Sequence, residues 1–383
     1  MKLAPFASNP ESSRGRKFDE VESRTRSKFQ RDRDRIVHSA AFRKLQHKTQ
    51  VFVYHEGDYF RSRLTHSLEV AQIARSISRV LQLDEDLAEA LALAHDLGHP
   101  PFAHAGEMAL QDAMAPYGGF DHNAQAIRLL TSLEARYAEY NGLNLTWETL
   151  EGIAKHNGPI AAPLPWALQD YNNQHDLELE THAGPEAQVA ALADDIAYDN
   201  HDIDDGVRAG LITVDQLRGL PLIGRHIISL KDQYSDIEQT RLVYEAKRRL
   251  ITQMVDDLVQ ETRERIAQFN PQSAEDVRYL GQPLVGFSDT LIIEREDLKD
   301  FLFQKLYRHF RVNRMSSKVK RVVKDLFHLF LKQPDCLPDD WQNRTSGSET
   351  VETARVVCDF IAGMTDRFAF EEHQKLFDFF SRT

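Results

Sequence analysis

The sequence predicts a nearly all-α protein, and three observations support this fold class. Apolar residues recur with helical spacing along most of the chain. Many of these runs follow a residue suited to a helix N-cap and end near Gly, Pro or Asn. Strand-like runs are few and short. Repeats of about 20–50 residues are absent from the sequence, so we expect one helical core with additional C-terminal helices packed on it.

Composition and charge limit the classes of protein that fit. The chain has 383 residues, 42% of them hydrophobic, so it can bury a large core. Its formal net charge of −12 argues against nucleic-acid binding by bulk charge. Cys336 and Cys358 are too few for a disulfide framework. With no apolar signal sequence and no run of membrane-spanning length, the chain is expected to be cytoplasmic. We expect a flexible segment at 1–20, a core at 21–210 and a C-terminal helical region at 211–383.

The first helix is rich in arginine. Its basic residues are Arg24, Arg26, Arg31, Arg33 and Arg35. Asp32 and Asp34 lie among them, which favours a solvated face with ion pairs. The alternative is a phosphate-binding patch at a subunit contact. After a short β-like run at 46–53, Thr65 is the predicted N-cap of a helix with its buried side over 68–81, which places His66 in the first turn.

The most informative stretch runs from His95 to Glu107. It follows a predicted apolar helix over 84–94, with Asp84 as N-cap, and contains three histidines, one aspartate and one glutamate. Gly98 and the two prolines after His99 end the helix. Such a helix end fixes side-chain direction, as a catalytic or metal site requires. An isolated His-Asp pair, in contrast, is more often a capped helix end.

Further helices are predicted over 120–140 and after Thr146, an N-cap whose helix ends at Lys155. Lys155 and the histidine after it could complement the helix dipole or face a polyanion. The next helix begins at Pro185 and is rich in acids. Asp194, Tyr198 and Asp202 share one face of this helix, and Asp195 and Asp199 form the neighbouring stripe. Because buried acids are costly unless paired or metal-bound, one stripe is expected to be functional.

The C-terminal region is predicted to be helical as well. Thr213 begins a capping box, a long helix covers 237–269, and two more cover 298–310 and 315–331. The last two enclose a basic set: Lys305, Arg308, Arg311, Arg314, Lys318, Lys320, Arg321 and Lys324. These residues either form solvated helix faces or contact an anion. A loop over 333–349 precedes a final helical stretch.

Three separate helices thus supply His66, His95 with Asp96, and Asp194. Two imidazoles and two carboxylates form a mixed nitrogen and oxygen ligand set, which suits Mn²⁺, Fe²⁺, Zn²⁺ or, less well, Mg²⁺. Open coordination positions would leave room for water and a substrate oxygen, and the pKa of bound water can fall toward about 7.

These motifs together resemble the HD-domain phosphohydrolases, and within them the deoxyguanosinetriphosphate triphosphohydrolase family. The matching segments span nearly the whole chain. They are 63–67, 95–107, 120–123, 155–157, 186–202 and 359–367. The resemblance implies an HD-domain helical core and metal-dependent hydrolysis of dGTP and other deoxynucleoside triphosphates to deoxynucleoside and tripolyphosphate.

Carried over position by position, the resemblance implies a role for each site residue. His66, His95, Asp96 and Asp194 match ligands of one divalent metal per subunit, Mn²⁺ or Mg²⁺, with Fe²⁺, Zn²⁺ or Co²⁺ as alternatives. Asp194 is preferred to Asp195 because the family pattern has a tyrosine four residues after the ligand. His104 and Glu107 match the pair that prepares the nucleophile or protonates the leaving group. Positions lining the triphosphate and sugar match Arg63, His99, His122, Lys155, Tyr198 and Asp202. Arg308 or Arg311 is expected to reach the triphosphate.

The resemblance also implies a homo-oligomer, a hexamer or another even assembly, which could hold an activating nucleotide between subunits. The short segment from Asp121 to Asp194 predicts broad or activator-dependent specificity. Two alternatives remain. An HD-type phosphodiesterase or nucleotidase is favoured if His99, His104 or His122 complete a second metal site. A catalytically weak nucleotide sensor or single-strand nucleic-acid binder would keep the fold without turnover.

Overall fold

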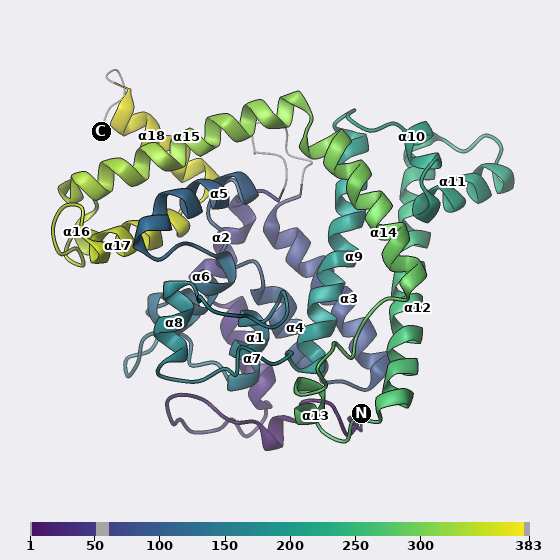
Figure 1. Cartoon of the computed structure of the whole chain (residues 1–383), viewed down its shortest axis with the longest axis horizontal. Coiled ribbons are helices and arrows are strands. Elements are labelled where there is room, and N and C mark those ends of the chain that lie inside the picture. Colours follow the sequence, from purple (N-terminus) through teal and green to yellow (C-terminus); the bar gives the residue numbers. More distant parts are fainter. Residues whose placement is uncertain (1, 51–60, 379–383) are drawn as a thin grey trace.

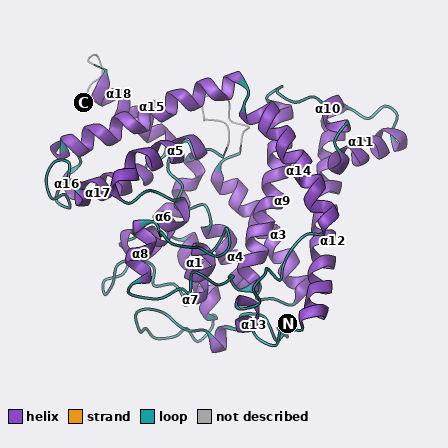
Figure 2. Ribbon diagram, viewed as in Figure 1, coloured by secondary structure: helices purple, strands orange, loops and turns teal. Residues whose placement is uncertain are grey.

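The computed structural model describes residues 2–50 and 61–378, and within these residues all the named elements are helices (Figures 1 and 2). This confirms the predicted all-α fold. The first half contains α1 (Lys28–Val37), α2 (Ala40–Lys44), α3 (Arg63–Leu81), α4 (Glu85–Ala94), α5 (Ala103–Met114), α6 (His122–Arg128), α7 (Trp147–Ala154), α8 (Trp166–Asn172) and α9 (Pro185–Arg208). The second half contains α10 (Val214–Arg218), α11 (Pro221–Gln233), α12 (Gln239–Phe269), α13 (Ala274–Arg278), α14 (Asp289–Leu302), α15 (Phe310–Lys332), α16 (Asp339–Gln342), α17 (Val351–Ala362) and α18 (Asp366–Phe377).

Helix α4 is the centre of the core. Its Leu and Ala residues are buried on nearly all sides, and α1, α3, α7 and α9 pack around it. A helix that is apolar all round is stable only inside a protein. The predicted cap is observed, because Asp84 accepts a hydrogen bond from the backbone N–H of Leu87. The C-terminal end of α4 therefore delivers its last residues to the interior.

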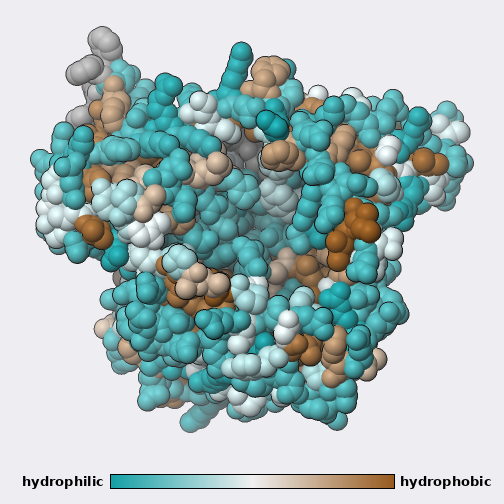
Figure 3. All heavy atoms as spheres, viewed as in Figure 1, coloured by the Kyte–Doolittle hydropathy of each residue, from teal (hydrophilic) through white to brown (hydrophobic). Residues whose placement is uncertain are grey.

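Two groups of helices flank the core. Helices α9, α12 and α14 lie on one side, and α15, α17 and α18 lie on the other (Figure 1). The space-filling view shows a hollow between them that is lined mostly by hydrophilic residues (Figure 3). The N-terminal segment lies against the core, where the Ser8 N–H donates to Glu186 over 2.9 Å and Arg14 pairs with Glu178 over 2.7 Å.

Several predicted boundaries were wrong. Helix α3 begins at Arg63, because Ser62 rather than Thr65 is its N-cap and accepts from the Thr65 N–H. The Thr65 hydroxyl instead donates to the Ser62 carbonyl, as threonines inside a helix often do. Helix α15 begins at Phe310, five residues before the predicted start, after the His309 side chain caps it. The β-like prediction at 46–53 lies partly outside the described residues.

The helix predicted over 120–140 ends much earlier. Helix α6 stops at Arg128 and passes into one π turn, Leu129–Leu133. The chain then turns back, and the Leu143 N–H donates to the Leu130 carbonyl over 2.7 Å. This bond takes the acceptor that a continued helix would use for its own N–H group, so the helix ends.

Ion pairs surround the arginine-rich helix α1, as the sequence predicted, but Asp32 and Arg35 are buried and do not lie on a solvated face. Arg26 pairs with Asp34 over 2.9 Å, and Arg35 pairs with Glu20 over 2.7 Å. Arg33 reaches across to Glu89 of α4 at 3.2 Å. The arginines therefore attach α1 to its neighbours and to the N-terminal segment.

Candidate active site

The four predicted metal ligands come together where α3, α4 and α9 meet. His66 lies in α3, His95 and Asp96 follow the last residue of α4, and Asp194 lies in α9. The Nε2 atom of His66 is 2.7 Å from Oδ1 of Asp194, and Nε2 of His95 is 3.6 Å from the same oxygen. One ligand atom each from His66, His95 and Asp96 lies within 4.8 Å of the others. The donor atoms thus surround one small volume.

The state of these atoms suits a divalent cation. His95 donates from Nδ1 to the Ala92 carbonyl over 2.7 Å, which leaves a lone pair on Nε2. That Nε2 atom and Oδ2 of Asp96 are buried and have no hydrogen-bond partner among the residues that the structure describes. Buried polar atoms are rarely left unpaired without a reason. Two imidazoles and two carboxylates fit Mn²⁺, Fe²⁺ or Zn²⁺ in ligand type.

The structure separates the two adjacent acids of α9. Asp194 faces His66, whereas Asp195 pairs with Arg295 at 3.0 Å and with Lys299 at 3.5 Å. Arg295 also bonds Asp199 over 2.7 Å, so the second acidic stripe is held by α14. Asp194 therefore belongs to the ligand cluster, whereas Asp195 and Asp199 are paired with α14.

The carboxylates of the cluster are ionised at neutral pH. Burial alone would raise the pKa of Asp96, but Arg63, whose Nη1 lies 2.6 Å from Oδ1, lowers it to about 2. The pKa of Asp194 is likewise well below its usual value, because the surrounding histidines outweigh its burial. A metal requires its carboxylate ligands in this deprotonated form.

A second row of residues behind His66 was missed by the sequence reasoning. Nδ1 of His66 lies 3.0 Å from Nδ1 of buried His201, and Nε2 of His201 contacts the carboxylate of Glu69. Burial lowers the pKa of His201 to about 4, so its ring is neutral. The spacing signal exists, since Glu69 is one helical turn from His66 and His201 is two turns from Asp194. We call Glu69 and His201 the supporting pair.

A second cluster lies beside the first and contains His99, His104, Glu107 and His122. Glu107 contacts His122 more closely than His104: Oε1 is 2.6 Å from Nδ1 of His122, whereas Oε2 is 3.6 Å from Nδ1 of His104. The rings of His99 and His122 stack at 4.0 Å. Although burial opposes it, the charge of Glu107 raises the pKa of His122. His122 is therefore suited to carry a proton at neutral pH.

Both clusters open into one cavity of about 540 Å³. Predicted substrate residues that line it are Arg63, His99, His122, Tyr198 and Asp202. Asp195 and Asp199 of the second acidic stripe also line it. So do several residues that the sequence did not assign to the site, among them Gln50, His156, Asn157, Lys299 and Tyr307. The cavity combines cationic, neutral and acidic groups beside the ligand cluster, which is a pattern typical of an active site.

Tyr307 is the clearest omission. It ends the π turn after α14, and its hydroxyl lies 2.6 Å from the Tyr198 hydroxyl while donating to Asp202. Nothing in the local sequence signals a π turn, so only the tertiary structure places this ring. The network fixes Tyr198 and Asp202 at the wall of the cavity.

Three predicted substrate residues lie elsewhere. The Lys155 ammonium is buried, 3.1 Å from Glu151 and 2.7 Å from the Thr181 hydroxyl, and is not among the residues lining the cavity. Arg308 and Arg311 also lie outside the lining, with their guanidinium groups near Phe303 and Phe310. Lys155 is a good partner for Glu151 one turn earlier, and that pairing turns it away.

Comparison with known proteins identifies the class and then the family. Residues 63–199 match the family model of the HD domain, and residues 285–375 match that of a phosphohydrolase-associated domain. The helical fold and its histidine–aspartate cluster are accordingly those of an HD-domain hydrolase. The chain is 59% identical over 381 residues to a deoxyguanosinetriphosphate triphosphohydrolase-like protein of Parvibaculum lavamentivorans, covering 98% of this chain and 96% of that one.

Other relatives carry the same description. Identity is 56% over 378 residues to the protein of Caulobacter vibrioides, covering 98% of this chain and 96% of the relative. It is 52% over 383 residues to one of Mesorhizobium japonicum, covering 98% and 95%. The chain belongs to the family of deoxyguanosinetriphosphate triphosphohydrolase-like proteins. Among the described helices, none has the length and apolar character needed to cross a membrane.

Proposed function

We propose that this protein hydrolyses dGTP and other deoxynucleoside triphosphates to deoxynucleoside and tripolyphosphate. The observation that carries the proposal is the convergence of His66, His95, Asp96 and Asp194. Three of them, His95, Asp96 and Asp194, line a cavity that also holds cationic side chains. The name shared by the relatives supports the substrate class.

In this proposal each cluster has its own task. His66, His95, Asp96 and Asp194 hold one divalent ion, Mn²⁺ or Mg²⁺ first, which would polarise a phosphate oxygen and acidify water. Arg63 keeps Asp96 ionised and adds positive charge beside a substrate with about four negative charges.

The proton transfer is assigned to the second cluster. Glu107 holds His122 by the 2.6 Å contact, and His104 projects into the cavity with a side chain that is 57% exposed. Either imidazole could protonate the leaving oxygen or accept a proton from water. The network of Tyr198, Tyr307 and Asp202 offers a rigid wall and hydroxyl groups for the sugar.

The remaining proposals concern context. We propose a cytoplasmic homo-oligomer, a hexamer or another even assembly, with an activating nucleotide held between subunits. Arg308 and Arg311 are both exposed. One of them could reach the triphosphate if the substrate extends beyond the cavity. We also propose that the protein binds single-stranded nucleic acid weakly, a property that needs no catalysis.

The first experiment is a substrate panel. The full chain is incubated with Mn²⁺ and each of the four deoxynucleoside triphosphates, alone and mixed, and the products are separated. Tripolyphosphate with free deoxynucleoside is expected, at comparable rates for the four substrates or only in the mixture. Exclusive use of dGTP would refute the broad specificity, and orthophosphate or pyrophosphate would refute the reaction.

Glu107→Gln tests the proton carrier. Because the carboxylate raises the pKa of His122, its removal lowers that pKa. If His122 acts as the acid, activity is lost as pH rises through its pKa, so the alkaline limb of the pH–rate profile should move to lower pH. An alkaline limb that stays in place would assign the proton to another group, with His104 the next candidate.

A second function is favoured by one observation. His99, Glu107 and His122 place ligand atoms within 4.8 Å of one another and could hold a second ion. Two ions per subunit would suit an HD-type phosphodiesterase or nucleotidase. Plasma emission spectroscopy, which counts the metal ions per subunit, distinguishes the two functions. One ion per subunit supports the triphosphohydrolase, and two support the alternative. Nucleotide binding without turnover would indicate a sensor.

A further inference from the structure

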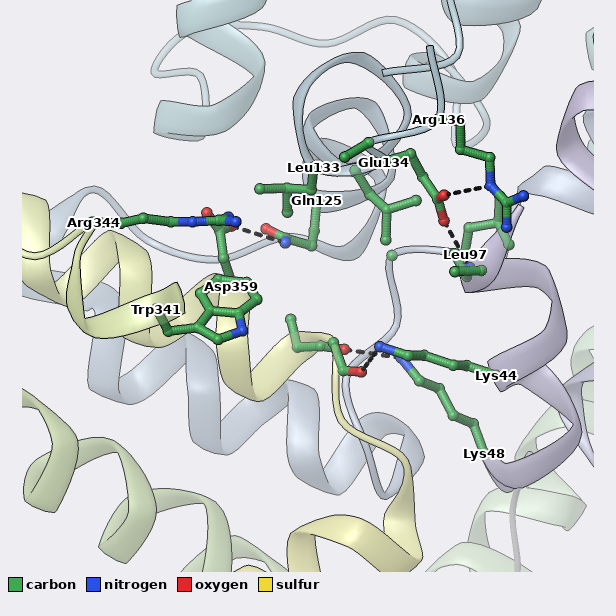
Figure 4. A pocket seen from close by; sticks show the side chains of 17 residues that line it. Lys44, Lys48, Leu97, Gln125, Leu133, Glu134, Arg136, Trp341, Arg344 and Asp359 are labelled. Atoms are coloured by element: carbon green, nitrogen blue, oxygen red, sulfur yellow. Dashed lines mark hydrogen bonds and ion pairs between the residues drawn. The ribbon is translucent and has the colours of Figure 1, made fainter. Parts of the chain in front are cut away.

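A second cavity lies behind the His95–His99 turn and has no part in the reaction proposed above. It encloses about 490 Å³ between α2, the π turn after α6, α16 and α17 (Figure 4). We call it the rear pocket. Leu97 and Gly98 line it, whereas their neighbours His95, Asp96 and His99 line the active-site cavity. One turn of the chain therefore contributes to both cavities.

The rear pocket has an excess of positive charge. Its charged lining residues are Lys44, Lys48, Glu134, Arg136, Arg344 and Asp359. Both acids have partners: Arg128, outside the lining, pairs with Asp359 at 2.7 Å, and Glu134 pairs with Arg136 at 3.3 Å while accepting from the Ala41 N–H at 2.8 Å.

Within residues 2–50 and 61–378, the other three cations have no carboxylate at ion-pair distance. Lys44 donates to the Gly363 carbonyl over 2.7 Å, and Lys48 donates to the carbonyls of His99 and Ala362. Within the described residues, no carboxylate lies at ion-pair distance from Arg344, whose guanidinium lies 4.8 Å from the ring of Trp341 (Figure 4). Three cationic donors and an indole therefore border one concave space, an arrangement that suits an anion with a small organic part.

Lys48 connects this pocket to the active site. Its buried ammonium lies 2.6 Å from the His99 carbonyl, and its own carbonyl accepts from the Arg63 N–H at 3.0 Å. Burial lowers the pKa of Lys48 to about 7. The turn itself has little freedom, since a Cβ on Gly98 would lie 1.9 Å from the His122 carbonyl. A change at Lys48 therefore has a short, packed route to His99 and Arg63.

We propose that the rear pocket binds a small phosphate-bearing molecule and that its occupancy is transmitted to the active-site turn through Lys48. Phosphate is favoured over a single carboxylate because the pocket offers several separated cationic donors and more volume than a carboxylate fills. The binding site does not depend on which reaction the protein catalyses.

The test is a calorimetric titration of the metal-free full chain with inorganic pyrophosphate. The wild type is expected to bind at the rear pocket in addition to the active-site cavity. The double variant Lys44→Ala/Arg344→Ala should bind at the rear pocket at least about tenfold more weakly. The matched control is Lys332→Ala/Arg218→Ala, which removes two exposed cations elsewhere and should titrate like the wild type. Identical isotherms for all three proteins would overturn the proposal.

A second variant keeps the test valid if the double variant does not fold. Ala135 is exposed at the rim, so Ala135→Asp adds a repelling charge without disturbing the core. It should weaken the same site, and unchanged binding would count against the proposal. Competition for this site by ribose 5-phosphate would identify a phosphorylated sugar as the natural class, whereas binding of pyrophosphate alone would identify an inorganic polyphosphate.

Transmission to the active site has its own readout. Pyrophosphate should slow amide hydrogen exchange over residues 95–107 in the wild type and in Arg63→Ala, which weakens the active-site anion contact. The protection should disappear in Lys44→Ala/Arg344→Ala. Protection that persists in this double variant would show that the turn responds only to the active-site cavity and would refute the coupling.

Discussion

His95→Ala and Asp194→Ala are each expected to abolish tight Mn²⁺ binding and to lower turnover of deoxynucleoside triphosphates by about 10³-fold or more. Each substitution removes one of the four convergent donors, and a bound ion supplies several kcal/mol of transition-state stabilisation. The fold should persist. Within the described residues the printed hydrogen bond of the His95 side chain goes to the Ala92 carbonyl of the adjoining helix, and the Asp194 side chain contacts other side chains of the site, His66 and His156. Calorimetry with Mn²⁺ measures metal binding, a rate assay measures turnover, and thermal unfolding checks the fold.

The control is the adjacent acid. Asp195→Asn keeps the shape of the side chain and removes a charge that faces Arg295 and Lys299 rather than the cluster. It should bind Mn²⁺ with wild-type affinity. Full activity in His95→Ala or Asp194→Ala, or loss of metal in Asp195→Asn, would contradict the ligand assignment.

The supporting pair is expected to affect the metal at a distance. Glu69→Ala and His201→Ala should each weaken Mn²⁺ binding about 10–100-fold, the usual cost of losing a group that orients a ligand. Neutral His201 can accept the His66 Nδ1 proton while donating to Glu69, and this orientation leaves Nε2 of His66 toward the metal. Without the pair, His66 can rotate or change tautomer.

Because Glu69, His201 and His66 contact one another in series, the losses of Mn²⁺ affinity should not add. Glu69 acts on His66 only through His201, so the double variant should bind Mn²⁺ about as weakly as His201→Ala alone. His226→Ala is the matched control, since half-buried His226 lies 2.7 Å from Oε1 of Gln253, away from the site. Additive losses, or equal losses in His226→Ala, would show a general structural effect instead.

These predictions depend on geometry that local sequence only partly specifies. Helix starts at Asp84, Thr146 and Pro185 could be predicted because a cap or a first-turn proline acts within three residues of itself. The start of α3 was misplaced because Ser62 and Thr65 are both good caps and tertiary packing chose the earlier one. The end of α6 depended on the returning loop, in which the Leu143 N–H donates to the Leu130 carbonyl.

The same division holds for the candidate site. The motif residues His66, His95, Asp96 and Asp194 are identifiable because chemistry restricts which residue types recur in a metal cluster. Side-chain direction is a different matter. Lys155 turns to Glu151, and Glu107 approaches His122 more closely than His104, because each charged group takes the best partner that folding brings near.

The sequence by itself determined the all-α class, most helix starts, the family and the residue types of the ligand cluster. Those features arise from interactions within one or two helical turns or from a motif pattern along the chain. Only the tertiary structure decided that Tyr307 joins Tyr198, that His201 and Glu69 stand behind His66, and that Lys44, Lys48 and Arg344 border one cavity. Each of these groups joins residues far apart in sequence, and local propensity carries no information on such contacts.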